Sequence, residues 1–282
     1  MHTLSEPEEL RLLLKDLRRA GETIGFVPTM GNLHAGHLSL VETAIASCTF
    51  CVASIFVNPM QFGENEDLES YPRSLEQDSD ALNDLGCHCL FLPSESSLYP
   101  EGTKSHTRIQ VPSLAEMYCG EHRPGHFDGV TTVVAMLLNI VQPDSAFFGL
   151  KDFQQFLLIK KMVNDLRMEV SLKGVETVRE SSGLAMSSRN NYLDTAQRKQ
   201  AAQLYATLQD AAEKIRSGEL DFARLEKEAL DTLEDAGFRP DYFAICEQSN
   251  LATAGLETSD FAIIAAAHLG DTRLIDNVRF SL

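Results

Sequence analysis

The sequence has few basic residues and no long hydrophobic run. Lys and Arg number 24 against 41 Asp and Glu in 282 residues, so the formal net charge is -17. This charge would repel a phosphate backbone or an anionic lipid surface over most of the molecule, which argues against nucleic acid as a partner. A small phosphate-bearing ligand remains compatible with it, provided that a local group of Lys, Arg and His side chains holds that ligand.

No stretch is apolar enough to cross a membrane. The longest apolar-rich run, 129–141, is shorter than the ~18 to 20 residues that a span needs, and Thr131, Thr132 and Asn139 interrupt it. The N-terminal segment MHTLSEPEELRLLLKDLRR carries first acidic and then basic residues, as an amphipathic helix does, and lacks the uninterrupted apolar core of a signal peptide. We therefore expect a cytoplasmic protein without membrane attachment.

The six cysteines do not form an evident metal site. Cys48 and Cys51 have the spacing of a zinc knuckle, and Cys87 and Cys89 lie close together. Both pairs fall in or beside runs typical of buried strands, CTFCVASIFV and CHCLFL, where a free cysteine behaves as a small hydrophobic residue. A zinc site is the alternative, and reduced core thiols are the preferred interpretation.

Short apolar runs alternate with helical patterns, which predicts an α/β fold with a Rossmann-like parallel sheet. Beyond Arg189 the pattern changes to amphipathic helices followed by strand-like segments around a Gly-Asp turn. We therefore expect a Rossmann-like domain over 1–176 and a smaller α+β C-terminal domain over 177–282, with a ligand cleft between them. Strands are expected at 22–27, 49–57, 87–92, 145–148 and 241–246, and helices at 37–46, 75–85, 130–141, 153–166, 196–217 and 222–236.

The segment PTMGNLHAGH follows a predicted strand and opens a predicted helix. Such a turn lies at the carboxyl edge of a parallel sheet, where free N–H groups and the positive end of the helix dipole favour phosphate. His34 and His37 could face one phosphate chain and donate hydrogen bonds that strengthen as negative charge builds. Two histidines satisfied within an ordinary turn are the alternative, and the position between strand and helix favours phosphate chemistry.

Two further segments supply candidate phosphate donors. FGLKDFQQ again joins a strand to a helix, so the ammonium of Lys151 could reach the same sheet edge and Gln155 could point back toward the ligand. Asp152 is either a ligand contact or a helix N-cap. MSSR, at 186–189, places two hydroxyls beside the planar donor fork of Arg189. Because the tripeptide SSR is common, its value lies in its position on a polar loop that could close over a nucleotide.

Two segments are candidate substrate walls. FVNPMQF ends the second predicted strand and presents Asn58 and Gln61 among apolar neighbours, a mixture that suits a small hydroxylated acid with methyl groups. RPGHF offers Arg123 and His126 just before a helix, and an exposed turn is an equally good interpretation of it.

Taken together, these segments resemble the pantothenate synthetase family, and the resemblance covers most of the chain. PTMGNLHAGH, FVNPMQF, YPR, RPGHFDGVTTVV, FGLKDFQQ, TVRE, GLAMSSRN and TRLIDN follow one another in the family's order. The family belongs to a nucleotidyltransferase-like superfamily with an HxGH signature on a Rossmann-like domain and a smaller C-terminal lid. The resemblance implies a cytoplasmic homodimer that uses ATP, Mg²⁺, pantoate and β-alanine.

The implied reaction is a ligation in two steps. Pantoate carboxylate attacks the α-phosphorus of ATP to give pantoyl adenylate and pyrophosphate, and the amine of β-alanine then releases AMP and forms pantothenate. By resemblance, His37 is the acid that serves phosphate transfer, Gln61 and Gln155 hold pantoate with Asn58 nearby, and Mg²⁺ rides on the ATP phosphates with Asp78 in its outer surroundings. The implied catalytic residues are His37, His34, Lys151 and Arg189, and the implied ATP contacts are Met30, His34, His37, Gly149, Leu150, Lys151, Asp152, Val178, Met186, Ser187, Ser188 and Arg189.

The sequence departs from the family pattern near the predicted lid. Ser181 and Ser182 stand where members often carry an acidic residue, and Glu176 replaces the proline that precedes TVRE. These changes affect the shape of the lid loop and leave the phosphate donors in place. The HxGH signature also fits a transferase that moves a nucleotide and stops there, or a nucleotide sensor without catalysis.

Overall fold

The structure, a computed structural model, comprises two compact units and describes residues 1–63, 68–69 and 71–282. The first unit contains Met1–Leu150 and Leu158–Glu176, and the second contains Lys151–Leu157 and Thr177–Leu282. Helix α7 (Phe153–Asp165) therefore gives its first residues to the second unit and the remainder to the first. The expected domains 1–176 and 177–282, with their separate binding and lid roles, stay a prediction.

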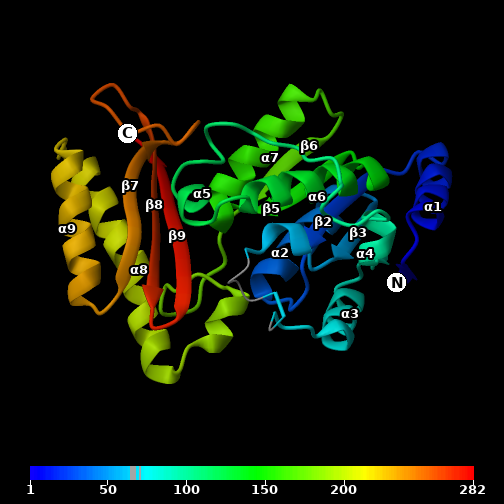
Figure 1. The fold of residues 1–282 in the computed structure, drawn as a ribbon, viewed down its shortest axis with the longest axis horizontal. Coiled ribbons are helices and arrows are strands. Elements are labelled where there is room, and N and C mark those ends of the chain that lie inside the picture. Colours follow the sequence, from blue (N-terminus) through cyan, green and yellow to red (C-terminus); the bar gives the residue numbers. More distant parts are fainter. Residues whose placement is uncertain (64–67, 70) are drawn as a thin grey trace. The chain divides into compact units, whose positions relative to one another are not determined.

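The first unit is built on a six-stranded parallel sheet (Figure 1). From β2, the strands β3 and β4 follow in one direction across the sheet, and β5 and β6 follow in the other. The strand order therefore reverses between the neighbours β2 and β5. Open α/β sheets bind ligands beyond the carboxyl ends of the strands at such a reversal of order. The sheet runs β1 (His2–Leu4), β4 (Cys89–Phe91), β3 (Phe50–Ile55), β2 (Ile24–Thr29), β5 (Ser145–Gly149) and β6 (Ser171–Val175).

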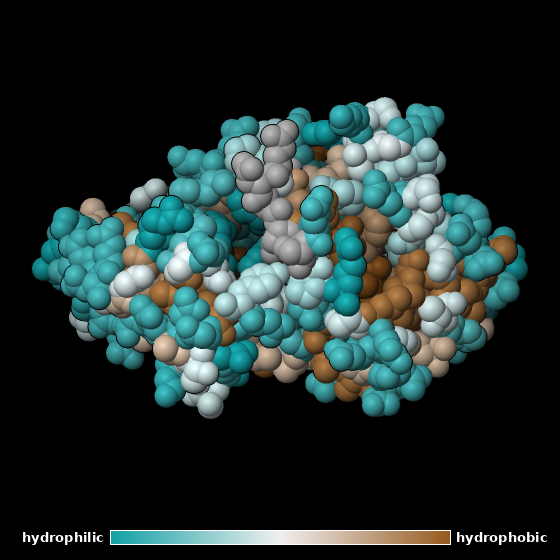
Figure 2. Space-filling model, turned by 60° about the horizontal axis from the view of Figure 1, so that its bottom comes forward, coloured by the Kyte–Doolittle hydropathy of each residue, from teal (hydrophilic) through white to brown (hydrophobic). Residues whose placement is uncertain are grey.

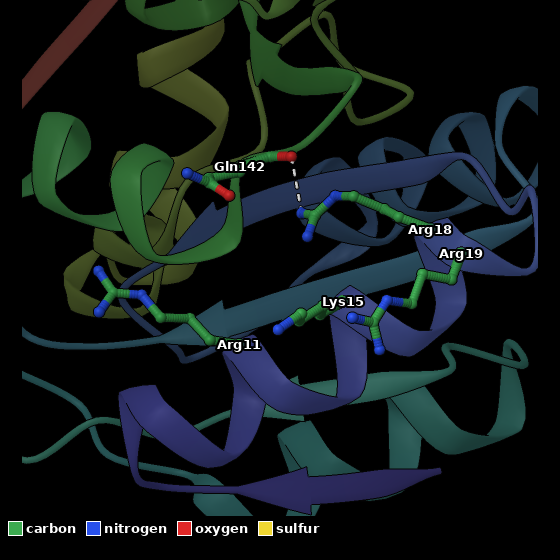
Figure 3. A pocket seen from close by; sticks show the side chains of 5 residues that line it. All are labelled: Arg11, Lys15, Arg18, Arg19 and Gln142. Atoms are coloured by element: carbon green, nitrogen blue, oxygen red, sulfur yellow. Dashed lines mark hydrogen bonds between the residues drawn. The ribbon is translucent and has the colours of Figure 1, made fainter.

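The helices of the first unit bury apolar side chains in the core of that unit. Leu10 and Leu14 of α1 are fully buried, and the apolar helix α6 buries most of its residues. Arg18 joins these two helices, because its guanidinium donates to the carbonyl oxygens of Val141 and Gln142, the latter at 2.8 Å (Figure 3). A cation is favourable there, since a helix ends with a negative partial charge. The helices are α1 (Pro7–Arg19), α2 (Ala35–Ser47), α3 (Leu75–Asp84), α4 (Glu95–Leu98), α5 (Cys119–His122), α6 (His126–Val141) and most of α7.

The second unit combines an antiparallel sheet with two long helices. Strands β7 (Arg239–Glu247), β8 (Asp260–Leu269) and β9 (Thr272–Ser281) pair in that order, and β8 is buried along most of its length. Helices α8 (Thr195–Arg216) and α9 (Phe222–Asp235) contribute Leu204, Leu208 and Leu233 to the same apolar core. The predicted fold class, a Rossmann-like parallel sheet followed by a smaller α+β part, is confirmed.

All six cysteines are free and buried. The Cys87 thiol lies 3.7 Å from the carbonyl oxygen of Cys51 and 3.5 Å from that of Cys89, contacts that a core thiol makes with neighbouring strands. Burial, reinforced by the nearby Cys87, raises the pKa of the Cys89 thiol to about 12. Among the residues that the structure describes, no three or more His, Cys, Asp or Glu side chains are grouped so that they could hold a metal ion, and the contacts of Cys87 are those of a core thiol.

One face of the molecule is drawn by hydropathy in Figure 2. Most of the face drawn in Figure 2 carries hydrophilic side chains, with apolar side chains gathered in part of it. Across the residues that the structure describes, no helix is long and apolar enough to span a membrane.

Candidate active site

The segment PTMGNLHAGH leads from β2, at the carboxyl end of a central strand, into α2, which begins at Ala35. His34 is the N-cap of α2; its Nδ1 accepts the N–H of Gly36 at 3.1 Å, and His37 Nδ1 accepts the N–H of His34 at 3.4 Å. Because Nδ1 is the acceptor in each ring, a neutral imidazole carries its proton on Nε2. The two ring centroids lie 4.1 Å apart. The two imidazoles thus lie next to each other, and the N–H donor of each ring is at Nε2.

Asp78 of α3 holds the backbone that precedes the histidines. Its two carboxylate oxygens accept the N–H groups of Asn32 and Leu33, both at 2.8 Å, and the Ser74 hydroxyl donates to Oδ1 at 3.1 Å. A Cβ on Gly31, where φ is +79°, would lie 3.1 Å from Asp78 Oδ2, so the turn requires glycine at this position. The carboxylate therefore positions backbone, and its expected place in the outer surroundings of Mg²⁺ stays a prediction.

Asn58 and Gln61 lie beside Met30 within the first unit. Asn58 precedes the short 3-10 helix η1 (Pro59–Gln61), and its Nδ2 donates to Gln61 Oε1 at 3.2 Å. Gln61 Nε2 in turn donates to Met30 Sδ at 2.8 Å. Both amides are buried, with 0% and 8% exposure. The structure thus brings the two candidate pantoate residues together with a candidate ATP contact.

The RPGHF segment lies against Gln61. His126 Nδ1 is 2.8 Å from the carbonyl oxygen of Gln61, and His126 Nε2 is 2.9 Å from Arg123 Nη1. In the following turn of α6, a Cβ on Gly129 would lie 2.3 Å from the carbonyl oxygen of Met60. Helix α6 can therefore approach η1 this closely only with glycine at 129. These contacts place the segment at the wall formed by Asn58 and Gln61.

Lys151 follows directly from β5 and belongs to the second unit. Gly149 ends β5, Leu150 begins the 3-10 helix η2 (Leu150–Asp152), and α7 starts at the next residue. The carbonyl oxygen of Lys151 accepts a hydrogen bond from Asn277 Nδ2 of β9 at 2.9 Å. The side chains of Lys151, Asp152 and Gln155 are half-buried.

The loop with Met186–Arg189 is fastened to the same strand. Met186 N donates to the carbonyl oxygen of Val178 at 2.9 Å, and Ser187 Oγ accepts the N–H of Arg189 at 3.3 Å as η3 (Ser188–Tyr192) begins. Arg179 forms a two-pronged ion pair with Asp276, at 2.6 and 2.9 Å.

Asp276 and Asn277, which are consecutive on β9, therefore hold two segments of the second unit. One carries Lys151 and the other carries Ser187, Ser188 and Arg189. The candidate site residues fall into two groups. Met30, His34, His37, Asn58, Gln61, Asp78, Gly149 and Leu150 belong to the first unit, and Lys151, Asp152, Gln155, Val178 and Met186–Arg189 belong to the second. Their convergence on one triphosphate stays a prediction.

A basic cavity of about 540 Å³ is lined by residues of α1 and by Gln142 (Figure 3). Arg11 pairs with Glu8 at 3.0 Å and Arg19 with Asp16 at 3.4 Å, while Arg18 is bound to the carbonyl groups at the end of α6. Two of its four cationic side chains are thus paired with carboxylates, and Arg18 connects α1 to the end of α6. The cavity is lined by Arg11, Lys15, Arg18, Arg19 and Gln142, none of them a candidate site residue.

Known proteins match this chain over nearly its whole length. The profile of the Pantoate-beta-alanine ligase family matches residues 2–279. The chain belongs to this family. A pantothenate synthetase of Hahella chejuensis is 52% identical over 282 residues, which cover 100% of both chains. One of Methylococcus capsulatus is 53% identical over 282 residues, covering 100% of this chain and 99% of that protein.

Solved structures of the pantoate-beta-alanine ligase family also share the fold. The pantothenate synthetase of Thermus thermophilus has a TM-score of 0.92 and 45% identity, with 99% of each chain covered. The Francisella tularensis pantoate-beta-alanine ligase, solved in complex with beta-gamma ATP and beta-alanine, has a TM-score of 0.82 and 34% identity over 99% of this chain and 97% of that one. The resemblance drawn from the sequence is confirmed.

Sequence reasoning missed residues whose hydrogen bonds hold the candidate site residues or their segments in place. Tyr99 donates a hydrogen bond to Asn58, yet it lies 41 positions away along the chain in a segment with no chemical signature of its own. Asp276 and Asn277 are part of TRLIDN, a segment whose place in the family order gave it no role. A buried acid followed by an amide on a predicted strand was the one available signal for that pair.

Proposed function

We propose that the chain is an ATP-dependent ligase that joins pantoate to β-alanine and yields pantothenate, AMP and pyrophosphate. One observation carries the proposal: a member of this family holds two imidazoles 4.1 Å apart at the carboxyl end of β2. The same unit presents the buried amides of Asn58 and Gln61 beside Met30. The Francisella relative, solved with beta-gamma ATP and beta-alanine, supports two of the ligands.

In the first proposed step, a carboxylate oxygen of pantoate attacks the α-phosphorus of ATP. The bond from that phosphorus to the bridging oxygen breaks, and pyrophosphate leaves with the electron pair. The Nε2 donors of His34 and His37 would stabilise the charge that builds on the phosphate oxygens, and Lys151 and Arg189 would add positive charge. The remaining proposed nucleotide contacts are Met30, Gly149, Leu150, Asp152, Val178, Met186, Ser187 and Ser188.

In the second proposed step, the amine of β-alanine attacks the activated carbonyl of pantoyl adenylate. A C–N bond forms, the amine loses a proton, and AMP leaves with the electron pair of the C–O bond. Gln61 and Gln155 would hold pantoate through both steps, with Asn58 orienting Gln61. The residues thus supply alignment and charge stabilisation, and no covalent bond to the protein is needed.

Mg²⁺ is proposed to enter on the ATP phosphates. Both carboxylate oxygens of Asp78 already accept backbone N–H groups, and the described part of the chain contains no group of three His, Cys, Asp or Glu side chains suited to a metal. This donor set does not fit a magnesium site made by protein alone, so no step is assigned to the ion.

Two properties of the whole chain complete the proposal. Six free, buried cysteines support a reducing, cytoplasmic location. Pairing of two chains through the first unit is proposed from the family resemblance, and the apolar side chains gathered on part of the face in Figure 2 are compatible with it. Analytical ultracentrifugation tests the pairing, and a mass of one chain at micromolar concentration would argue against it.

Product formation with each substrate omitted in turn tests the reaction. The complete mixture of ATP, pantoate and β-alanine should give AMP and pantothenate in equal amounts. Pantoate and ATP without β-alanine should support exchange between pyrophosphate and ATP but no sustained AMP release. ATP consumption that ignores β-alanine would instead indicate a transferase that stops after nucleotide transfer.

A variant of the histidine turn tests the assignment of the phosphate donors. His37→Ala should lower the rate of adenylate formation by a factor on the order of 100 or more, as loss of a charge-stabilising donor commonly does. His2→Ala, which removes an exposed imidazole from β1, is the matched control and should leave the rate unchanged. An unchanged rate in His37→Ala would remove this residue from the mechanism.

A further inference from the structure

A hydrogen-bond chain runs from Tyr99 through Asn58 to Gln61 inside the first unit. The Tyr99 hydroxyl donates to Asn58 Oδ1 at 2.7 Å, and Asn58 Nδ2 donates to Gln61 Oε1 at 3.2 Å. Tyr99 and Asn58 are 2% and 0% exposed. Burial raises the pKa of Tyr99, so its hydroxyl stays protonated over the working range of the protein and remains a donor.

The Asn58 amide has all of its hydrogen-bonding positions in use. Oδ1 accepts from the Tyr99 hydroxyl and, at 3.3 Å, from Met60 N; Nδ2 donates to Gln61 Oε1 and, at 3.1 Å, to the carbonyl oxygen of Gly129. Two donors face its oxygen and two acceptors face its nitrogen. Rotating the amide by half a turn would oppose like groups at the two backbone contacts, the N–H of Met60 and the carbonyl oxygen of Gly129, so its orientation is fixed.

This fixed orientation determines which end of Gln61 faces the candidate site. Gln61 Oε1 is held by Asn58, and Nε2 points to Met30 Sδ at 2.8 Å. A thioether is a weak acceptor, so a carboxylate or hydroxyl oxygen at this place would form a stronger bond with Nε2.

We propose that Tyr99 is a positioning residue that holds Gln61, through Asn58, in the orientation that binds an oxygen-bearing substrate. By donating to Asn58 Oδ1, Tyr99 adds to the contacts that hold the Asn58 amide, and Asn58 in turn keeps the N–H end of Gln61 toward Met30, where a carboxylate or hydroxyl oxygen can accept. The proposal rests on the proposed function for the identity of that substrate, pantoate.

Tyr99→Phe tests this role with the loss of one oxygen atom. The ring and its contacts with Phe56 and His106 remain. The KM for pantoate should rise roughly three- to tenfold, the range expected for loss of one buried hydrogen bond, while the KM for ATP changes by less than about twofold. Tyr242→Phe, which removes a hydroxyl from β7 in the second unit, is the matched control and should change neither constant.

A second measurement does not depend on turnover. The side-chain NH2 signals of Asn58 and Gln61, followed by heteronuclear NMR, should shift in Tyr99→Phe and stay in place in Tyr242→Phe. Signals that do not move, or KM values for pantoate and ATP that rise equally, would overturn the proposal. If the unmodified protein forms no pantothenate, the proposed function fails, and the NMR signals still decide whether Tyr99 orients the amides.

Discussion

At the scale of single residues, the candidate site depends on side chains that hold others in place. Asp78 is the clearest case, because it binds two backbone N–H groups of the turn before His34 and is 3% exposed. The contacts therefore suggest that the conformation of the turn, and with it the spacing of the imidazoles, depends on this side chain.

Asp78→Asn separates a backbone role from a role beside Mg²⁺. The amide keeps one acceptor but turns its NH2 toward a backbone N–H, so the free energy of unfolding should fall by about 1–3 kcal/mol. Activity should fall at every Mg²⁺ concentration, without a change in the concentration needed for half-maximal rate. A large increase in that concentration with unchanged stability would instead place Asp78 next to the ion. Asp80→Asn, on the same helix, is the control.

Glu226 gives a pH dependence of stability. Burial raises the pKa of its carboxyl above the ordinary value of 4.5, although the Ile245 N–H, which donates to Oε1 at 2.7 Å, opposes the shift. A carboxyl with a raised pKa in the folded protein contributes stability at acidic pH and loses that contribution as the pH rises through the folded pKa. At neutral pH the ionised Glu226 is therefore unfavourable.

Glu226→Gln should raise the midpoint of urea unfolding at neutral pH, since the amide keeps an acceptor for Ile245 and carries no charge. The difference between variant and parent should shrink as the pH falls through the raised folded pKa toward 4.5, because the parent side chain becomes neutral in that range. Glu234→Gln, at an exposed position of α9, should show no such trend. A gain independent of pH would contradict the explanation by charge burial.

At the scale of elements, β9 is the support of the second unit's candidate site. Arg179 is bound by Asp276, donates to the carbonyl oxygen of Gly183 at 3.1 Å and lies 3.5 Å from the centre of the Tyr205 ring. Asn277 holds the carbonyl oxygen of Lys151. One strand thus fixes the starts of two segments that carry candidate phosphate donors.

Asp276→Ala should lower the free energy of unfolding by roughly 2–4 kcal/mol, because it leaves Arg179 in a largely buried position without its partner. The side chain of Arg179 is 17% exposed, which gives it some access to water and reduces the loss. The KM for ATP should rise as the loop at 186–189 loosens. Asp271→Ala, in the exposed turn between β8 and β9, is the control, and equal losses in both variants would contradict this role.

Periodicity predicted most elements but not the contacts between them. The strand expected at 22–27 is found at 24–29, and the two C-terminal strands meet at the expected Gly-Asp turn. Helix α6 starts at His126. The prediction placed its start at Val130, because glycines such as those at 125 and 129 are typical of a loop. Strand β1 was missed, since its three residues are too few to show alternation and pair with β4 far along the chain.

The candidate site was predictable in its residue types and not in its geometry. Turns after parallel strands gave His34, His37 and Lys151, because chain direction alone places them at the carboxyl edge of the sheet. The partners of Gln61 could not be predicted in the same way: His126 reaches it from 65 positions away. Such contacts depend on how helices pack, which local patterns do not encode.

At the scale of the whole molecule, the buried cysteines report on both units. Cys51 and Cys89 lie in the sheet of the first unit and Cys246 lies in β7 of the second, all at 0% exposure. Because α7 contributes residues to both units, we expect the units to unfold together. Alkylation of these thiols across a urea series, read by mass spectrometry, should show one shared midpoint. Labelling of Cys246 well before Cys51 would show independent unfolding.

The course of α7 also sets where the polypeptide can be cut. Phe153 and Leu157, 5% and 6% exposed, group with the C-terminal residues, and the guanidinium of Arg279 lies 5.2 Å from the Phe153 ring. Cleavage between Glu176 and Thr177 would place Phe153 and Leu157 on the N-terminal fragment and the residues grouped with them on the C-terminal fragment. Separation of the fragments would therefore expose these two apolar side chains to water. We therefore expect the two fragments to be functional only when they are expressed together and associate.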